Sequence, residues 1–321
     1  MKSFILAGVM SVCAFAAVSA QAEAKGEMKI GVSIPSADHG WTGGVVWNAK
    51  KAIEEWSKKD PSIKFSLVTA ANPAEQVGQV EDLMVKGIQC LVILPHDSAP
   101  LTPVCQKAKE AGILLVVVDR GLSKPIADIY VAGDNPGLGR VSGEFMARQM
   151  KGEGDIVVLE GIPCVINTER VDAFKEVMKK YPKIKTLDSQ PAYWSTQKGL
   201  EIMENYLQKY KKIDAVWAQD DDVLKGVLQA YKESGRKDIK FFLGGAGNKD
   251  VIKMVLDKNP LVPADVTYPP AMVKSAIEQA VTAVKAGAKP AGEGKGKKII
   301  IPSELVTPEN AKDYYVAESV F

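Results

Sequence analysis

The fold of this chain is constrained most by the way short apolar runs alternate with segments of helical periodicity. The runs are continuous stretches of Val, Ile and Leu, which are typical of parallel strands buried on both faces. Between them, apolar residues recur at helical spacing, as in Val45, Ala49 and Ala52. The predicted strands are residues 28–34, 64–69, 90–94 and 114–119 in a first series, and 155–160, 184–190, 215–219 and 240–244 in a second.

The order of strand, helix and strand occurs in both series, which predicts an α/β protein with two doubly wound parallel sheets. The first series closes near residues 129–131, and Asp134 then opens a new helix. The strand pattern gives way again near residues 261–263. The chain is long enough for two lobes of ordinary size, and we expect one sheet in each lobe.

The first 24 residues predict a secretory signal peptide that is cleaved. Lys2 is followed by an apolar run over residues 4–18 and then by small residues at cleavage-type spacing. The run is too short to span a bilayer comfortably. Cys13 lacks the small preceding residue of a lipoprotein signal, so we expect export of a soluble chain to the periplasm.

Charge and cysteine content exclude several classes of protein. The chain has 41 basic and 39 acidic residues and a formal net charge of +2, which gives no electrostatic case for nucleic acid. After Cys13, three cysteines remain, and their spacing suits no zinc site. A bridge between Cys90 and Cys105 is one alternative, and buried free thiols are the other, which we favour. We expect no metal and no cofactor.

The candidate site comes from the rule that loops at the carboxyl ends of parallel strands form the ligand crevice. Polar and aromatic residues gather in these loops. They are Asp38, His39 and Trp41 after the first strand, Asp119 and Arg120 after the fourth, Asn167 and Arg170 after the fifth, Trp194 after the sixth and Asp220 after the seventh.

These residue types suit a ligand rich in hydroxyl groups. Carboxylates and guanidinium groups make charge-assisted hydrogen bonds to neighbouring hydroxyls, and indole rings lie against the C–H faces of a sugar. Trp41 and Trp194 are predicted in polar loops, whereas the periodicity places Trp47, Trp56 and Trp217 in the core. Helix capping is the alternative reading of Asp221 and Asp222. We find no nucleophile motif and no dinucleotide fingerprint.

Several segments together resemble the periplasmic sugar-binding proteins related to ribose-binding protein, which are type I solute receptors of ABC transporters. The resemblance is carried by residues 29–41, 116–120 (VVVDR), 133–135 and 215–220 (AVWAQD), among others. It implies ligand contacts from Asp38, His39, Trp41, Asp119, Arg120, Arg170, Trp194, Asp220 and Tyr268. Ala246 stands where the family commonly has an aspartate, so the pattern of bound hydroxyls is expected to differ.

The resemblance also implies a type I periplasmic binding protein fold, with two lobes joined by a three-stranded hinge near Val131, Ala264 and Pro290. The N-terminal lobe is then residues 25–131 plus 265–290, and the C-terminal lobe residues 132–264 plus 291–321.

The function that follows is capture of a sugar or sugar alcohol by a monomer, and delivery to an inner-membrane ABC permease. Two alternatives remain open, which are an exported sugar-processing enzyme and a soluble receptor for a chemotaxis sensor. In the binding-protein reading, we expect the arginine beside Asp119 to hold that carboxylate ionised and hydrogen-bonded.

Overall fold

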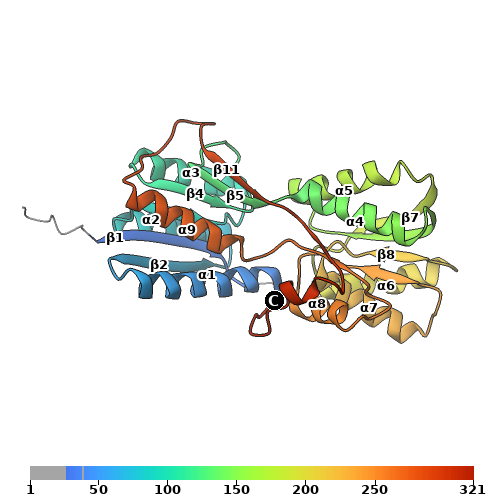
Figure 1. The fold of residues 1–321 in the computed structure, drawn as a ribbon. Helices are drawn as coiled ribbons and strands as arrows, with labels where there is room; N and C mark the ends of the chain where they lie inside the picture. The colour runs from blue at the N-terminus through green and yellow to red at the C-terminus, as the bar shows by residue number, and fades with distance from the viewer. Residues whose placement is uncertain (1–26, 38–39) are drawn as a thin grey trace, which may run out of the picture.

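The structure is a computed structural model that describes residues 27–37 and 40–321. The predicted signal peptide and the candidate residues Asp38 and His39 lie outside the described residues. No helix in the described part of the chain combines the length and the apolar character that a membrane crossing requires. Figure 1 shows two lobes side by side, with the chain passing between them more than once.

The N-terminal lobe is built on a parallel six-stranded sheet of order β11-β5-β4-β3-β1-β2. Helices α1 (Gly40–Lys59) and α9 (Met272–Lys285) cover one face, and α2 (Pro73–Val85) and α3 (Ser98–Glu110) cover the other. The strands are β1 (Met28–Pro35), β2 (Ile63–Ala70), β3 (Cys90–Ile93), β4 (Leu114–Val118), β5 (Ile129–Gly133) and β11 (Lys297–Ile301).

The C-terminal lobe has a parallel four-stranded sheet of order β7-β6-β8-β9. Helices α4 and α5 lie on one face, and α6, α7 and α8 lie on the other (Figure 1). The strands are β6 (Glu153–Glu160), β7 (Lys183–Pro191), β8 (Ala215–Trp217) and β9 (Phe241–Leu243); the helices are α4 (Asn135–Gln149), α5 (Val165–Met178), α6 (Thr196–Lys209), α7 (Asp221–Ser234) and α8 (Lys249–Leu256). The prediction of two doubly wound parallel sheets is confirmed.

Successive residues of the central strands are buried on opposite faces of each sheet, which explains their continuous apolar sequence. Leu91 and Ile93 of β3 pack toward α2 and α3, whereas Val92 packs toward α1 and α9. The cluster on the α1 side continues through Leu138 and Ala246 into the C-terminal lobe, where it includes Trp217 and Phe174. One apolar core therefore extends across both lobes.

Three crossovers connect the lobes and are hydrogen-bonded to one another. The first joins β5 to α4, the second joins β10 (Asp265–Val266) to α9, and the third joins β11 to β12 (Leu305–Val306). The Asp134 amide donates to the Ile301 carbonyl at 2.9 Å, and the Thr267 amide donates to the Glu304 carbonyl at 2.9 Å. Strands β10 and β12 pair antiparallel, and the short helix α10 (Ala311–Tyr314) follows.

The third crossover lies later in the chain than the sequence predicts. Residues 291–321 were expected in the C-terminal lobe, with a crossing near Pro290. Strand β11 instead pairs with β5 as an edge strand of the N-terminal sheet, so the crossing follows Ile301. The stretch before β11 is rich in Gly and Lys, and the short apolar run over residues 299–301 was the strand signal that sequence reasoning missed.

The tryptophans of the predicted core differ in their environments. Trp217 is fully buried and stacks on Phe174 at 4.0 Å between ring centroids. Trp56 is half-buried against the edge of the N-terminal core. The core prediction for Trp47 is wrong, because its half-buried ring joins none of the described apolar clusters and lies near the ammonium groups of Lys51 and Lys274. Cys90 and Cys105 are buried free thiols.

Replacing Trp217 by alanine should lower the free energy of unfolding by about 3–5 kcal/mol, since a large buried ring is removed and leaves a cavity. Trp47→Ala should cost less than about 1 kcal/mol, because the ring is partly solvated. Urea unfolding of both variants and the wild type measures the difference. Equal losses at the two positions would contradict this assignment.

Candidate ligand site

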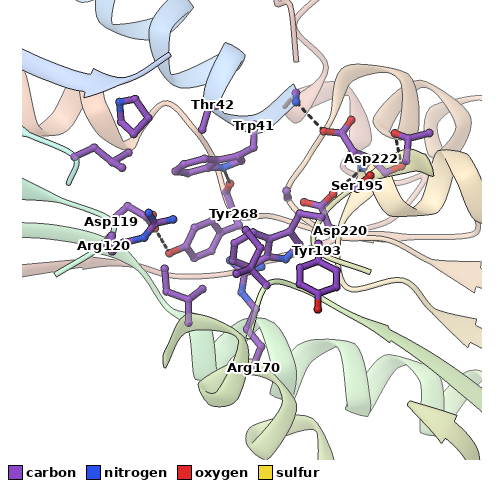
Figure 2. Close-up of a pocket in the computed structure, with 18 of the residues that line it drawn as sticks. Trp41, Thr42, Asp119, Arg120, Arg170, Tyr193, Ser195, Asp220, Asp222 and Tyr268 are labelled. Atoms are coloured by element: carbon purple, nitrogen blue, oxygen red, sulfur yellow. Dashed lines mark hydrogen bonds between the residues drawn. The ribbon is translucent and has the colours of Figure 1, made fainter. Parts of the chain in front are cut away.

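A cavity of about 480 Å³ lies where the carboxyl ends of the strands of both sheets meet. Its size falls within the usual range of small-molecule sites. Seven of the predicted site residues line it, and Figure 2 labels six of them. The seven are Trp41, Asp119, Arg120, Arg170, Trp194, Asp220 and Tyr268.

On the N-terminal side, Asp119 and Arg120 line the cavity but do not pair with each other. The Arg120 guanidinium donates to the carbonyls of Pro95 and His96 instead. The Asp119 carboxylate accepts a hydrogen bond from the Tyr268 hydroxyl at 2.5 Å. The prediction that Arg120 holds the Asp119 carboxylate is therefore wrong, because the carbonyls at the end of β3 hold the guanidinium.

Trp41 stands in the first turn of α1 and is 8 % exposed. Its indole N–H donates to the Tyr268 carbonyl at 2.9 Å, and the two rings lie 5.9 Å apart at 41°. The indole therefore has two roles, because it lines the cavity and also holds the second crossover against α1.

On the C-terminal side, Trp194 is held by a strained turn after β7. Tyr193 and Trp194 both have left-handed backbone conformations, with φ of 57° and 55°, which cost energy for residues other than glycine. The Trp194 ring lies against Gly161, where an added Cβ would come within 2.2 Å of the indole. Its N–H donates to Gln219 at 3.3 Å. The turn and the glycine together direct the ring into the cavity.

Asn167 is not among the residues that line the cavity. Its side-chain oxygen accepts from the Gly161 amide and from Gln219, both at 2.9 Å, and its amide donates to Glu160 at 3.1 Å. Through Gln219 these bonds reach the Trp194 indole. The structure thus makes Asn167 a support behind Trp194 and corrects the prediction of direct ligand contact.

Arg170 is 4 % exposed and projects from α5 toward the cavity (Figure 2). Its guanidinium carbon lies 4.3 Å from the centroid of Tyr268 and 5.6 Å from that of Trp194. Its Nε donates to Asn135 at 2.9 Å, and no carboxylate pairs with it in the described part of the chain. A buried cation held by two rings is a strong donor for an incoming polar group.

The acidic residues at the start of α7 have capping roles as well as places in the cavity. Asp220 is the N-cap and accepts from the amides of Asp222 and Val223. The Asp222 carboxylate accepts from the Gly40 amide at 2.9 Å, which joins the first residue of α1 to the opposite lobe. An added Cβ at Gly40 would lie 2.5 Å from the Asp222 oxygen. The reading of Asp221 and Asp222 as caps of their own helix is therefore wrong, because Asp220 caps α7 and Asp222 binds the first amide of a helix in the other lobe.

Sequence reasoning missed some of the lining residues. Tyr193 and Ser195 flank Trp194 in the same loop, so the loop itself was the available signal. His96 also lines the cavity, and its place just after β3, at the carboxyl edge of the sheet, was the available signal. No three His, Cys, Asp or Glu side chains gather as a metal site among residues 27–37 and 40–321.

Beneath the cavity, two fully buried carboxylates hold the turn that carries Ala246. Asp221 accepts from the amides of Gly245 at 2.9 Å and Asn248 at 2.6 Å, and Asp265 accepts from the Gly247 amide at 3.1 Å. Ala246 has φ of 102°, a strained conformation that these bonds maintain. Burial and then the charge of Asp265 raise the pKa of Asp221, and burial chiefly raises that of Asp265.

Comparison with known proteins identifies the family. Residues 30–289 match the model of the periplasmic binding protein domain, so the chain belongs to this family of binding proteins. The chain is 31 % identical over 267 residues to the ribose import binding protein RbsB of Bacillus subtilis, and this match covers 83 % of this chain and 84 % of that protein. It is 27 % identical over 297 residues to the galactofuranose-binding protein YtfQ of Escherichia coli, covering 89 % and 90 %.

Solved structures agree on the fold. The binding protein of the arabinose ABC transporter from Shewanella sp. ANA-3, bound to L-arabinofuranose, superimposes with a TM-score of 0.78 at 26 % identity, covering 90 % of this chain and 94 % of that chain. A solute-binding protein from Bacillus halodurans with bound myo-inositol gives a TM-score of 0.78 at 23 % identity, covering 90 % and 98 %. The predicted type I fold and the resemblance to sugar receptors are confirmed.

The raised pKa values of Asp221 and Asp265 predict a fall in stability as pH rises. In the unfolded chain both carboxyls ionise near pH 4, whereas the fold favours their protonated form. Stability is therefore greatest below the unfolded pKa and declines as pH climbs toward the raised values, by about 1.4 kcal/mol per unit of pKa shift. Asp265→Asn keeps an acceptor for Gly247 and removes one charge, so its profile should be flatter from pH 5 to 9 in urea unfolding.

Asp214→Asn is the matched control, because the pKa of Asp214 shifts the other way. Burial would raise it, but the Asp155 amide and then Lys212 and Lys240 lower it to about 2. Its contribution is complete above the unfolded carboxyl pKa and is lost only as pH falls toward 2. Asp214→Asn should thus lower stability evenly from pH 5 to 9, and a flattened slope in that variant would argue against the buried pair as the cause.

Proposed function

We propose that this protein is the exported receptor of a sugar importer, which binds a monosaccharide or sugar alcohol between its lobes and presents it to an inner-membrane ABC permease. The observation that carries the proposal is the cavity itself. It sets two indole rings, Trp41 and Trp194, beside Asp119, Arg120 and Arg170, and these groups come from both lobes. Aromatic faces with charged hydrogen-bonding groups suit the C–H faces and hydroxyls of a sugar.

The relatives support the same ligand class. The proteins compared above are named for binding ribose and galactofuranose, and the solved structures hold arabinofuranose and myo-inositol. We take the ligand of this chain to be a pentose, a hexose or a polyol of similar size. Ala246 lines the cavity with a methyl group and offers no side-chain hydrogen bond. We therefore expect the ligand to direct no hydroxyl group at this wall of the cavity.

Export, partners and mechanism complete the proposal. The signal peptide over residues 1–24 directs the chain to the periplasm, where it acts as a monomer. Rotation of the lobes about the three crossovers closes the cavity, and the ligand favours the closed form by its contacts with both lobes. The N-terminal lobe comprises residues 27–37, 40–133 and 269–301 of the described chain. The closed form is what a permease, or a chemotaxis sensor, would bind.

We infer binding without chemical turnover. Glycoside hydrolysis needs one carboxyl group as acid and another as nucleophile or base. Here Asp119 accepts from Tyr268, Asp220 caps α7 and Asp222 accepts from Gly40. Donors of the protein itself already engage these carboxylate oxygens, which suits fixed binding groups better than a pair of carboxyls that exchanges protons with a substrate. Product appearing in a sugar incubation would favour the exported-enzyme alternative.

The direct test is a thermal-shift screen of pentoses, hexoses and sugar alcohols, followed by titration calorimetry. A ligand at about 100 times its dissociation constant should stabilise the protein by about 2.7 kcal/mol. Arg120→Ala should weaken binding by about tenfold or more, since a charged donor at the cavity wall is lost.

Arg148→Ala is the control, because Arg148 is an exposed arginine on α4 away from the cavity. It should bind the sugar as the wild type does. No shift with any sugar would refute the proposed function, and equal affinity of Arg120→Ala and wild type would remove Arg120 from the site.

A further inference from the structure

Tyr268 is fixed at the junction of the two lobes. It follows β10 on the second crossover and is 2 % exposed. Its ring lies against Gly133, where an added Cβ would come within 2.2 Å of the ring, and its carbonyl accepts the Trp41 indole N–H. Its amide donates to the Ala246 carbonyl at 3.3 Å. The phenol therefore has little freedom to turn, and its hydroxyl has a set position.

That hydroxyl donates to Oδ1 of Asp119 at 2.5 Å, as the dashed line in Figure 2 shows. Asp119 is itself constrained, with a left-handed φ of 56°. Its amide donates to the Val131 carbonyl at 2.8 Å, and its own carbonyl accepts from the Tyr130 hydroxyl at 2.6 Å. The carboxylate thus enters the cavity in one orientation, with one oxygen already engaged.

The phenol acts here as a donor. Burial and then the charge of Asp119 raise the pKa of Tyr268 well above its usual range, so the hydroxyl keeps its proton. Two adjacent hydroxyls bind a carboxylate in a fork, with one donor on each oxygen. Because the phenol already donates to Oδ1, that fork is blocked and Oδ2 is the oxygen left for a ligand hydroxyl.

The face of the Tyr268 ring contacts a cation, the Arg170 guanidinium. The Arg170 guanidinium carbon lies 4.3 Å from the Tyr268 centroid, and the side chain has no carboxylate partner among the described residues. The same phenol thus restricts an acceptor of the N-terminal lobe and supports a donor of the C-terminal lobe. Among the described residues, no other ring of the cavity contacts both of these charged groups.

We infer that Tyr268 is a specificity-determining residue: by occupying Oδ1 of Asp119 it limits that carboxylate to a single ligand hydroxyl. This inference rests on the proposed function, since it concerns the sugar in that same cavity. Tyr268 acts through Asp119 and is a positioning residue. A ligand with two adjacent hydroxyls directed at Asp119 gains nothing from the second one while the phenol is in place.

The test combines protein variants with altered ligands. The probes are the sugar with the highest affinity in the screen above and the series of its monodeoxy analogues, which for D-ribose are 2-deoxy-D-ribose and its positional isomers. Calorimetry gives the affinity of each probe for the wild type, Asp119→Asn, Tyr268→Phe and the double variant. A hydroxyl that bonds to Asp119 is recognised because its removal and Asp119→Asn have non-additive effects.

In the wild type we expect one hydroxyl to couple to Asp119, with a non-additivity of about tenfold. In Tyr268→Phe, where Oδ1 is released, a second hydroxyl should couple, and the ranking of the deoxy analogues should change. Tyr130→Phe is the matched control, since this phenol donates to the Asp119 backbone carbonyl and leaves the carboxylate untouched. It should keep the wild-type pattern of one coupled hydroxyl.

Two results would overturn the inference. One is coupling of two hydroxyls, or of none, to Asp119 in the wild type, which can be measured even if Tyr268→Phe folds poorly. The other is a uniform loss of affinity for the parent sugar and every analogue in Tyr268→Phe, because that would mean a merely structural role. Both differ from failure of the proposed function, in which no sugar binds the wild type at all.

Discussion

The hydrogen bonds that join the three crossovers are the constraint on which the ligand site depends. Asp134 bonds to Ile301 and Thr267 bonds to Glu304, so three chain segments far apart in sequence stay side by side. Each sheet turns the carboxyl ends of its strands toward this junction, and loops from both sheets therefore meet there. Without the junction, the same loops would form two separate polar edges, each too open to exclude water from a small ligand.

Two aromatic rings of the site are positioned by glycines distant in sequence. Tyr268 lies on Gly133 and Trp194 lies on Gly161, and in both pairs a Cβ would approach the ring to 2.2 Å. Only a residue without a side chain lets a ring lie so close to the backbone. These glycines keep negative or ordinary φ values, so their role is close approach rather than an unusual turn. Ring and glycine together set the depth of the cavity.

Sequence reasoning located the sheets and most of the site because both depend on strand order. Continuous apolar runs identified eight parallel strands, and the edge rule then brought Asp119, Arg170 and Trp194 to one place without any knowledge of packing. Contacts that depend on tertiary partners were out of reach. Pairing with β5 decides the lobe to which β11 belongs, and carbonyls after β3 hold the Arg120 guanidinium. Trp47 lies on a half-exposed face of α1. Asn167 was placed at the right edge of the sheet, but it lies in the first turn of α5 and bonds to Gly161 and Gln219 behind Trp194.

The apolar cluster that runs through the junction has a consequence for how the molecule loses its structure. Trp41, Leu138, Ala246 and Tyr268 belong to the same cluster as the interiors of both lobes. Heat or denaturant that unfolds one lobe therefore exposes buried apolar surface of the other lobe to water. Although its two sheets share no strand, the chain should unfold in a single cooperative step, as one domain does, and not as two independent domains.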